Sequence, residues 1–269
     1  MRFPGVRLPM QGYKVGNMVF GKYYSRAVIT FFLLWMCFGE PVQAAEDVNN
    51  EIYGRLLSRF VSGGVVDYRG FKAEEGKLDQ YLEQLERTNT SELTANARLA
   101  FYINAYNAWT IKLVLGGYPG IKSIRDLGAV FSSPWVKKIC RIDGKILSLD
   151  DIEHGIIRPG FRDPRIHFAV NCASRGCPPL ASEPYSGMSL DEQLDTAARN
   201  FINDPARYRI DGNMLFVSMI FKWYASDFTD GVLNFIIKYA RGDLLRALTD
   251  KGDNIEIRYL KYDWSLNGK

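Results

Sequence analysis

The sequence predicts a mainly helical α+β fold with a small antiparallel sheet, and three observations support this prediction. Most segments space their apolar residues three or four positions apart, which is the period of an amphipathic helix. Residues 99–115 are apolar on nearly every side, as is typical of a helix buried at the centre of a fold. Only a few short runs are rich in branched and aromatic residues, which is the composition of strands.

The first 44 residues have the order of a secretory signal peptide. An apolar core at residues 27–38 is short for a membrane span and precedes the small-residue site Val42-Gln43-Ala44. The basic residues before that core are Arg2, Arg7, Lys14, Lys22 and Arg26. We therefore expect cleavage after Ala44 and export to the periplasm or the medium of a bacterium. An uncleaved anchor, or a start at Met10 or Met18, is the alternative.

The excess positive charge of the chain lies in this leader. Removing its five basic residues and the acidic Glu40 from totals of 34 and 30 leaves 29 of each, a formal charge of zero. A neutral mature chain gives no electrostatic reason to expect a nucleic-acid partner. Residues 45–269 contain no repeat and no linker-like tract, so we expect one globular domain there.

The first half of this domain is predicted to be helical. Residues 50–64 are amphipathic and end at a glycine pair, and residues 76–88 place several leucines on one face. Residues 65–71 are expected to form a short strand or an extended link. The central helix at 99–115 then closes at Gly116-Gly117 and Pro119.

The central helix carries two asparagines, Asn104 and Asn107, on one side of an otherwise apolar surface. A buried amide that is not hydrogen-bonded costs about 1–3 kcal/mol, so both must have partners. Two interpretations are open: the asparagines fasten neighbouring loops, or they line a polar pocket.

Residues 143–158 are predicted to form a turn, a short strand at 146–148 and a helix that ends before Pro159. Ser148 and Asp151 resemble a capping box at its start. Glu153 falls within the apolar face of this helix, whereas His154 lies outside it, toward Arg158. A buried carboxylate needs a partner, so Glu153 is expected to be bonded, either to an arginine or to a site residue that it orients.

Residues 166–170 are predicted to form a buried strand, followed by a loop at Asn171–Gly176 and by Pro178-Pro179. Residues 189–204 should form a helix capped by Ser189. A hairpin is expected around Asp211-Gly212-Asn213. The rest of the prediction consists of helices at 219–228, 231–240 and 242–251 and a closing strand after residue 254.

The loop after the predicted strand concentrates the reactive side chains. Cys37 leaves with the signal peptide, so Cys140, Cys172 and Cys177 remain, an odd number that leaves one thiol unpaired within the chain. Cys172, near Arg175, is the predicted nucleophile. The exposed amides of residues 173–176 are expected to hold an oxyanion.

The mature chain has two histidines that could serve as the base. A regular strand would place His167 and Cys172 on opposite faces and about 16 Å apart. His154 is therefore the first choice, with Glu153 and the asparagines orienting it, and His167 becomes a candidate only if the chain bends at Asn171. The predicted catalytic residues are Cys172, His154, Glu153 and His167. The predicted binding residues are Asn104, Asn107, Arg158, Asn171, Ser174 and Cys177.

Several motifs together resemble the domain of unknown function 547 (DUF547) family. They are "FYINAYNAWTIKLVL", "LSLDDIEHGIIR", "PRIHFAVNCASRGCPPL", "LDEQLDTAARNFIND" and "YDWSLN", in this order, and the resemblance covers residues 65–267. The family is found in bacteria and, joined to a leucine-zipper region, in plants. The resemblance implies that the signature positions are Asn104, Asn107, Glu153, His154, Arg158 and Cys172, but it implies no substrate.

Two functions fit these observations. The first is an exported thiol-dependent hydrolase or acyl transferase that acts on a peptide, an amide or a thioester. The second is a non-catalytic envelope binding protein in which Cys172 and Cys177 form a disulfide. A zinc site made of both cysteines and both histidines matches no standard spacing. We therefore expect no metal and no cofactor.

Overall fold

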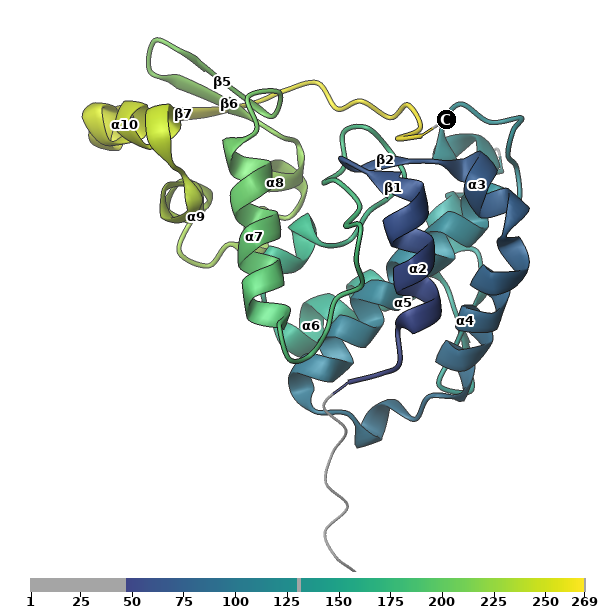
Figure 1. Ribbon diagram of the computed structural model, residues 1–269. Helices are drawn as coiled ribbons and strands as arrows, with labels where there is room; N and C mark the ends of the chain where they lie inside the picture. Colours follow the sequence, from purple (N-terminus) through teal and green to yellow (C-terminus); the bar gives the residue numbers. More distant parts are fainter. Residues whose placement is uncertain (1–46, 130–131, 269) are drawn as a thin grey trace, which may run out of the picture. The chain divides into compact units, whose positions relative to one another are not determined.

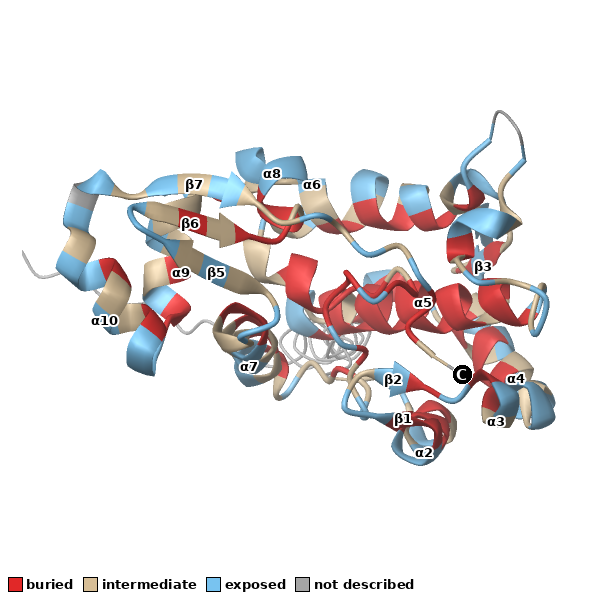
Figure 2. Cartoon of the chain, turned by 90° about the horizontal axis from the view of Figure 1, so that it is seen from above, coloured by how far each residue is buried: buried red, intermediate tan, exposed pale blue. Residues whose placement is uncertain are grey.

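Helix α5 (Ala95–Leu115) forms the centre of the helical part of the fold and is buried along nearly its whole length (Figures 1 and 2). The computed structural model describes residues 47–129 and 132–268, so the expected signal peptide lies outside the described residues. Thr94 caps the helix by accepting a hydrogen bond from the Ala97 amide, and the helix ends at Gly116. The predicted central helix is confirmed.

Short helices and two hairpins surround α5, and their apolar faces form the first hydrophobic core with it. The elements before α5 are α2 (Glu51–Phe60), β1 (Val61–Ser62), β2 (Val65–Val66), α3 (Tyr68–Ala73), α4 (Glu75–Arg87) and η1 (Thr90–Glu92). Those after it are η2 (Ile124–Leu127), η3 (Pro134–Val136), β3 (Cys140–Ile142), β4 (Lys145–Leu147), η4 (Asp151–Ile157), α6 (Arg158–Phe161) and η5 (Pro164–Phe168).

A three-stranded sheet and four helices form the second hydrophobic core. The elements are α7 (Leu190–Asn203), β5 (Tyr208–Asp211), β6 (Met214–Val217), α8 (Ile220–Trp223), η6 (Ala225–Asp227), α9 (Val232–Tyr239), α10 (Gly242–Lys251), η7 (Gly252–Asn254) and β7 (Glu256–Tyr259). Strand β6 pairs with β5 in the antiparallel and with β7 in the parallel direction. The mainly helical α+β class is confirmed, with one parallel pair in the sheet.

Segment η5 lies between the two cores. Ile166 packs into the first core and Phe168 into the second, and His167 stands between them. The strand predicted at 166–170 is wrong: these residues form a short 3-10 helix and a turn. Asp163 caps that helix by accepting from the Arg165 amide, and Pro164 starts it with its fixed φ. A short apolar run does not distinguish a strand from a helical turn.

Three further details differ from the prediction. The first helix ends at Phe60, and Gly63-Gly64, with φ of 55° and 78°, form the hairpin turn of β1 and β2. The helix after Ser148 does not end before Pro159, because a π-helical turn precedes α6 and places the proline in its first turn, where no amide donor is needed. Ser189 makes no side-chain cap for α7.

The capping box at Ser148 and Asp151 is confirmed, since each accepts a hydrogen bond from the backbone amide of the other. The predicted hairpin at residues 211–213 is confirmed as β5 and β6. Among the described residues, we find no helix that combines the length and the apolar character needed to cross a bilayer.

Candidate active site

A cavity of about 280 Å³ brings together all four predicted catalytic side chains. Cys172, Glu153, His154 and His167 line it, as does Cys177. The other prominent lining residues are aromatic: Tyr106, Trp135, Trp223, Tyr224, Tyr262 and Trp264. The volume suits a small molecule or a short segment of a larger one.

The Cys172 sulfur is surrounded by hydrogen-bond donors. Its Sγ lies 3.1 Å from the Ser174 hydroxyl and 3.3 Å from the Tyr262 hydroxyl, and these two oxygens are 3.0 Å apart. The Cys172 amide donates to the sulfur of Cys177 at 2.9 Å. Hydrogen bonds from the Cys177 thiol, Ser174 and Tyr262 stabilise the thiolate against the cost of burial, so the pKa of Cys172 falls to about 7. Burial raises the pKa of Cys177, which stays a thiol and a donor.

The loop that carries Cys172 is held by asparagine side chains. Asn107 accepts from the Asn171 amide at 2.8 Å and donates to the Ala169 carbonyl at 2.9 Å. Asn171 in turn accepts from the Ala173 amide and donates to the Pro178 carbonyl. These bonds hold Ala173 in the left-handed region, at φ 60°, which costs a non-glycine residue about 1–2 kcal/mol. Asn107 therefore positions the loop through its backbone.

Three of the four amides of the expected oxyanion site at residues 173–176 already have partners. The Ala173 amide is bonded to Asn171, the Arg175 amide to the Ser265 carbonyl and the Gly176 amide to the Asp263 carbonyl. The fourth, the Ser174 amide, donates to the Cys172 sulfur, and the hydroxyl groups of Ser174 and Tyr262 lie beside it.

The tail after β7 packs on the loop at residues 171–177, which carries Cys172 and is named the reactive loop. It places the ring of Tyr262 directly over Gly176, where a Cβ would lie 2.8 Å from the ring. The amide of Asn267 donates to the Ala173 carbonyl, and its side-chain amide donates to Asn171 at 3.1 Å. A glycine at 176 is therefore required for the contact between Tyr262 and Cys172.

His167 is bound to a carboxylate that the sequence analysis did not identify. Its Nε2 donates to Asp227 at 2.7 Å, and the same carboxylate accepts two hydrogen bonds of 2.7 Å from the Arg158 guanidinium. The imidazole stacks on Tyr224 with ring centroids 3.9 Å apart. Burial lowers the pKa of His167, whereas the Asp227 bond opposes this change. Its Nδ1 is buried and has no hydrogen-bond partner among the described residues, so the neutral ring keeps a free lone pair.

His154 is bound differently. The Arg158 guanidinium, which can only donate, lies 3.0 Å from its Nδ1, so this nitrogen accepts and the ring is neutral. Its Nε2 is 3.6 Å from Asp150, and 37% of its side chain is exposed. His154 therefore lies on the outer part of the cavity wall with both nitrogens next to charged neighbours.

Glu153 is buried and bonded, as predicted, but its partner is not an arginine. Its Oε1 accepts from the Tyr224 hydroxyl at 2.6 Å, and only 6% of the residue is exposed. Burial, followed by the charge of Glu153, raises the pKa of Tyr224, which stays protonated as the donor. Tyr224 thus links the acidic helix to His167 through a stacked ring and a hydrogen bond.

Asn104 fastens a different loop. It donates to the Tyr185 carbonyl at 2.7 Å and accepts from the Tyr185 amide at 2.9 Å. The interpretation that both asparagines of α5 tie down loops therefore describes their contacts. Sequence reasoning missed Asp227 and Tyr224, because the helix predicted at 219–228 does not indicate what their side chains bind. Tyr262 could have been found, because it opens the "YDWSLN" motif.

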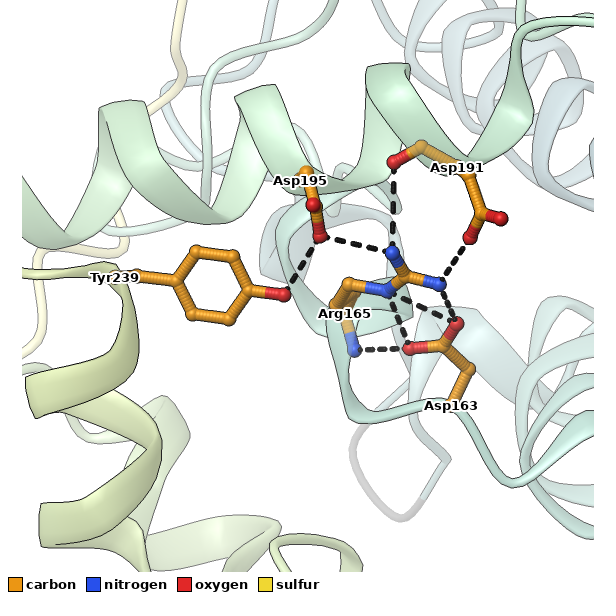
Figure 3. Close-up of polar contacts among 5 residues, drawn as sticks. All are labelled: Asp163, Arg165, Asp191, Asp195 and Tyr239. Atoms are coloured by element: carbon orange, nitrogen blue, oxygen red, sulfur yellow. Dashed lines mark hydrogen bonds and ion pairs between the residues drawn. The ribbon is translucent and has the colours of Figure 1, made fainter.

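An arginine fixes the short helix that carries His167 (Figure 3). Arg165 binds Asp163 on its own segment and Asp191 and Asp195 on α7, while Asp195 also accepts from the Tyr239 hydroxyl at 2.7 Å. The guanidinium is 19% exposed. It therefore holds η5 against α7.

Replacing Arg165 with methionine should lower the free energy of unfolding by about 1–2 kcal/mol, since it leaves partly buried carboxylates without their cation. Urea unfolding at neutral pH measures this. Arg246→Met is the matched control, because the pair of Arg246 with Asp243 is 75% and 87% exposed and should contribute under about 0.5 kcal/mol. Equal losses of stability in the two variants would contradict the conclusion that Arg165 holds η5 against α7.

Cys140, Cys172 and Cys177 are free thiols in the structure. Within residues 47–129 and 132–268, no cluster of three His, Cys, Asp or Glu side chains is arranged to hold a metal ion.

The comparisons with known proteins agree with the motif resemblance. The family model described as "Protein of unknown function, DUF547" matches residues 90–202. Searches of curated proteins and of solved structures gave no match. The matched range is shorter than the resemblance at 65–267: it includes α5, the Glu153 helix and the Cys172 loop but not the tail with Tyr262. Residues 90–202, which carry Cys172, Glu153 and both histidines, thus match the model of the DUF547 family of proteins of unknown function.

Proposed function

We propose that this protein is a thiol-dependent hydrolase or acyl transferase in which Cys172 is the nucleophile. One observation carries the proposal: a sulfur surrounded by hydroxyl and thiol donors opens onto a cavity that His167, bonded to Asp227, also lines. A thiolate at neutral pH that shares a cavity with an oriented imidazole is a combination suited to acyl transfer. The leader-like residues 1–44 support an exported enzyme, so envelope peptides, amides and thioesters are candidate substrates.

The first chemical step is attack of the Cys172 thiolate on the acyl carbon. A C–S bond forms, the carbonyl oxygen takes up the electron pair, and the bond to the leaving group then breaks as that group receives a proton. Water, or an acceptor nucleophile, next attacks the thioester, gives up a proton and restores the thiolate. No oxidant or metal is required.

The surroundings of the sulfur suggest where the developing charge goes. In the resting state, Tyr262 and Ser174 donate to the thiolate. During attack the charge moves from the sulfur to the acyl oxygen, and these hydroxyls can rotate to follow it. In this proposal they act together with the Ser174 amide as the oxyanion donors.

His167 is the proposed acid and base. No hydrogen bond joins the Cys172 sulfur to either imidazole among the described residues, so the thiolate is formed by its hydroxyl and thiol donors. As the Cys172 thiol ionises, the free Nδ1 of His167 takes up its proton through water in the cavity and passes it to the leaving group. The same nitrogen then accepts a proton from the attacking water, while Asp227 holds Nε2–H. His154 has its Nδ1 engaged by Arg158 and is given no proton-transfer role.

Alkylation by iodoacetamide tests the nucleophile. Cys172 should react with a half-maximal rate near pH 7, because its pKa is about 7. Cys140 should react at least tenfold more slowly at that pH, since burial raises its pKa to about 12. Peptide mapping by mass spectrometry gives both rates. Incubation with small activated esters and thioesters should then add an acyl group to Cys172, and Cys172→Ala should not acquire it.

Tyr262→Phe isolates the role of the hydroxyl. Loss of this donor should move the alkylation midpoint toward the ordinary thiol pKa, near 8.5. Tyr239→Phe is the matched control, because its hydroxyl bonds Asp195 away from the cavity. An ordinary midpoint in the wild type, together with no acyl adduct, would overturn the proposal and favour the binding protein.

A further inference from the structure

The cavity wall combines carboxylates with aromatic rings. Asp150 and Glu153 line it, and no lysine or arginine is among the described residues that do so. Around Trp264, ring centroids lie 5.9 Å away at Trp135, 5.7 Å at Trp223 and 4.5 Å at Tyr262. Apart from the two histidines and the two cysteines, the charged side chains on this wall are therefore carboxylates.

Only one of the two carboxylate oxygens of Glu153 accepts a hydrogen bond from the described residues. Its Oε1 accepts from Tyr224, whereas Oε2 accepts no hydrogen bond from the described residues. The two bases that feel its charge, Arg158 and His167, are both bonded to Asp227 instead. A carboxylate that is 6% exposed and has no cation of its own is costly unless a positive group joins it.

We propose that this wall binds a primary ammonium group of the substrate. The ammonium pairs with Glu153 Oε2, and the neighbouring rings of Trp223, Trp264 and Tyr262 provide faces that attract a cation. The substrate class is thus an amide, ester or thioester that also carries a free amine near its acyl carbon. This inference rests on the proposed function, because it places the amine in the cavity that Cys172 opens onto.

Alkylating reagents of different charge measure the preference without a known substrate. Cationic 2-bromoethylamine, neutral iodoacetamide and anionic iodoacetate each form a C–S bond to Cys172 and release halide. Each rate constant is divided by that for N-acetylcysteine at the same pH and low ionic strength, which removes the intrinsic reactivity of the reagent. The normalised ratio of the cationic to the anionic rate should be at least about tenfold, the effect of one carboxylate a few ångströms away in a partly buried site.

Glu153→Gln should lower this ratio by about tenfold, because it removes the charge but keeps an oxygen that can accept from Tyr224. The ratio cancels any change in the pKa of Cys172, which affects all three reagents alike. Glu83→Gln is the matched control: Glu83 is 61% exposed, pairs with Arg87 and should leave the ratio unchanged. Urea unfolding confirms that each variant is folded.

A wild-type ratio equal to that of N-acetylcysteine, or an unchanged ratio in Glu153→Gln, would overturn the ammonium site. Failure of the proposed function is seen separately, as an ordinary pH midpoint for the neutral reagent. If Cys172 is activated but shows no charge preference, the proposed nucleophile stands and the proposed ammonium site is rejected.

Discussion

Replacing Asn107 with leucine should lower the free energy of unfolding by about 2–6 kcal/mol and should also raise the pKa of Cys172. The substitution leaves the Ala169 carbonyl and the Asn171 amide without partners, and each costs about 1–3 kcal/mol when buried. Because these two groups flank the start of the reactive loop, their release also disturbs the donors around the sulfur. Urea unfolding measures the first effect, and the pH midpoint of alkylation measures the second.

Asn104→Leu is the matched control on the same helix. Asn104 also makes a paired hydrogen bond with a loop backbone, at Tyr185, so the loss of stability should be similar. That loop does not carry Cys172, so the alkylation midpoint should stay near pH 7. If both variants shift the midpoint equally, Asn107 has no specific role in positioning the thiol.

Asp227→Asn should lower the free energy of unfolding by about 3 kcal/mol. The carboxylate joins Arg158 and His167. Asparagine keeps one acceptor oxygen but removes the negative charge, so the guanidinium and the buried imidazole lose the anion that they share. In the proposed mechanism it should also slow acylation of Cys172 by esters, since Asp227 fixes the proton on Nε2 of His167.

The pH dependence of this loss follows from the direction of the pKa shift. Hydrogen bonds from Arg158 and His167 lower the pKa of Asp227 in the folded state below its unfolded value of about 4. The stability that Asp227 contributes is therefore fully present above about pH 4 and is lost as the pH falls through the folded pKa. The difference between wild type and variant should persist at neutral pH and shrink in strong acid.

Asp243→Asn is the control for this comparison. Asp243 is 87% exposed, so its pairing with Arg246 should contribute under about 0.5 kcal/mol at any pH. A wild-type advantage over Asp227→Asn that is small, or that grows in strong acid, would show that the carboxylate is not the shared partner described above.

The helical framework was predictable because its signals are local. The period of the leucines in α4, the continuous apolar surface of α5 and the capping box at Ser148 each depend on residues within a few turns. The candidate site residues on these helices were found from local signals too, because an asparagine or glutamate on an apolar helical face needs a hydrogen-bond partner. Their positions were predicted, although their partners were not.

The partners depend on contacts between segments distant in the chain. Asp227 is 60 residues from His167, and Tyr262 is 90 residues from Cys172. The choice of His154 over His167 depended on a regular strand at 166–170. Pro164 and the Asp163 cap make those residues a short helix, so the reason for preferring His154 no longer holds. Apolar runs of this length take their conformation from such neighbours.

Tyr262 and the residues that follow it pack on the loop that carries Cys172. This contact determines when the cavity can be completed during synthesis of the chain. A chain emerging from the ribosome delivers residues 262–267 after every other part of the cavity. Until then the amides of Arg175 and Gly176 lack their acceptors, and the sulfur lacks one of its hydroxyl donors. In the proposed enzyme, the Cys172 thiol therefore gains its full set of donors only after this tail has folded onto the loop.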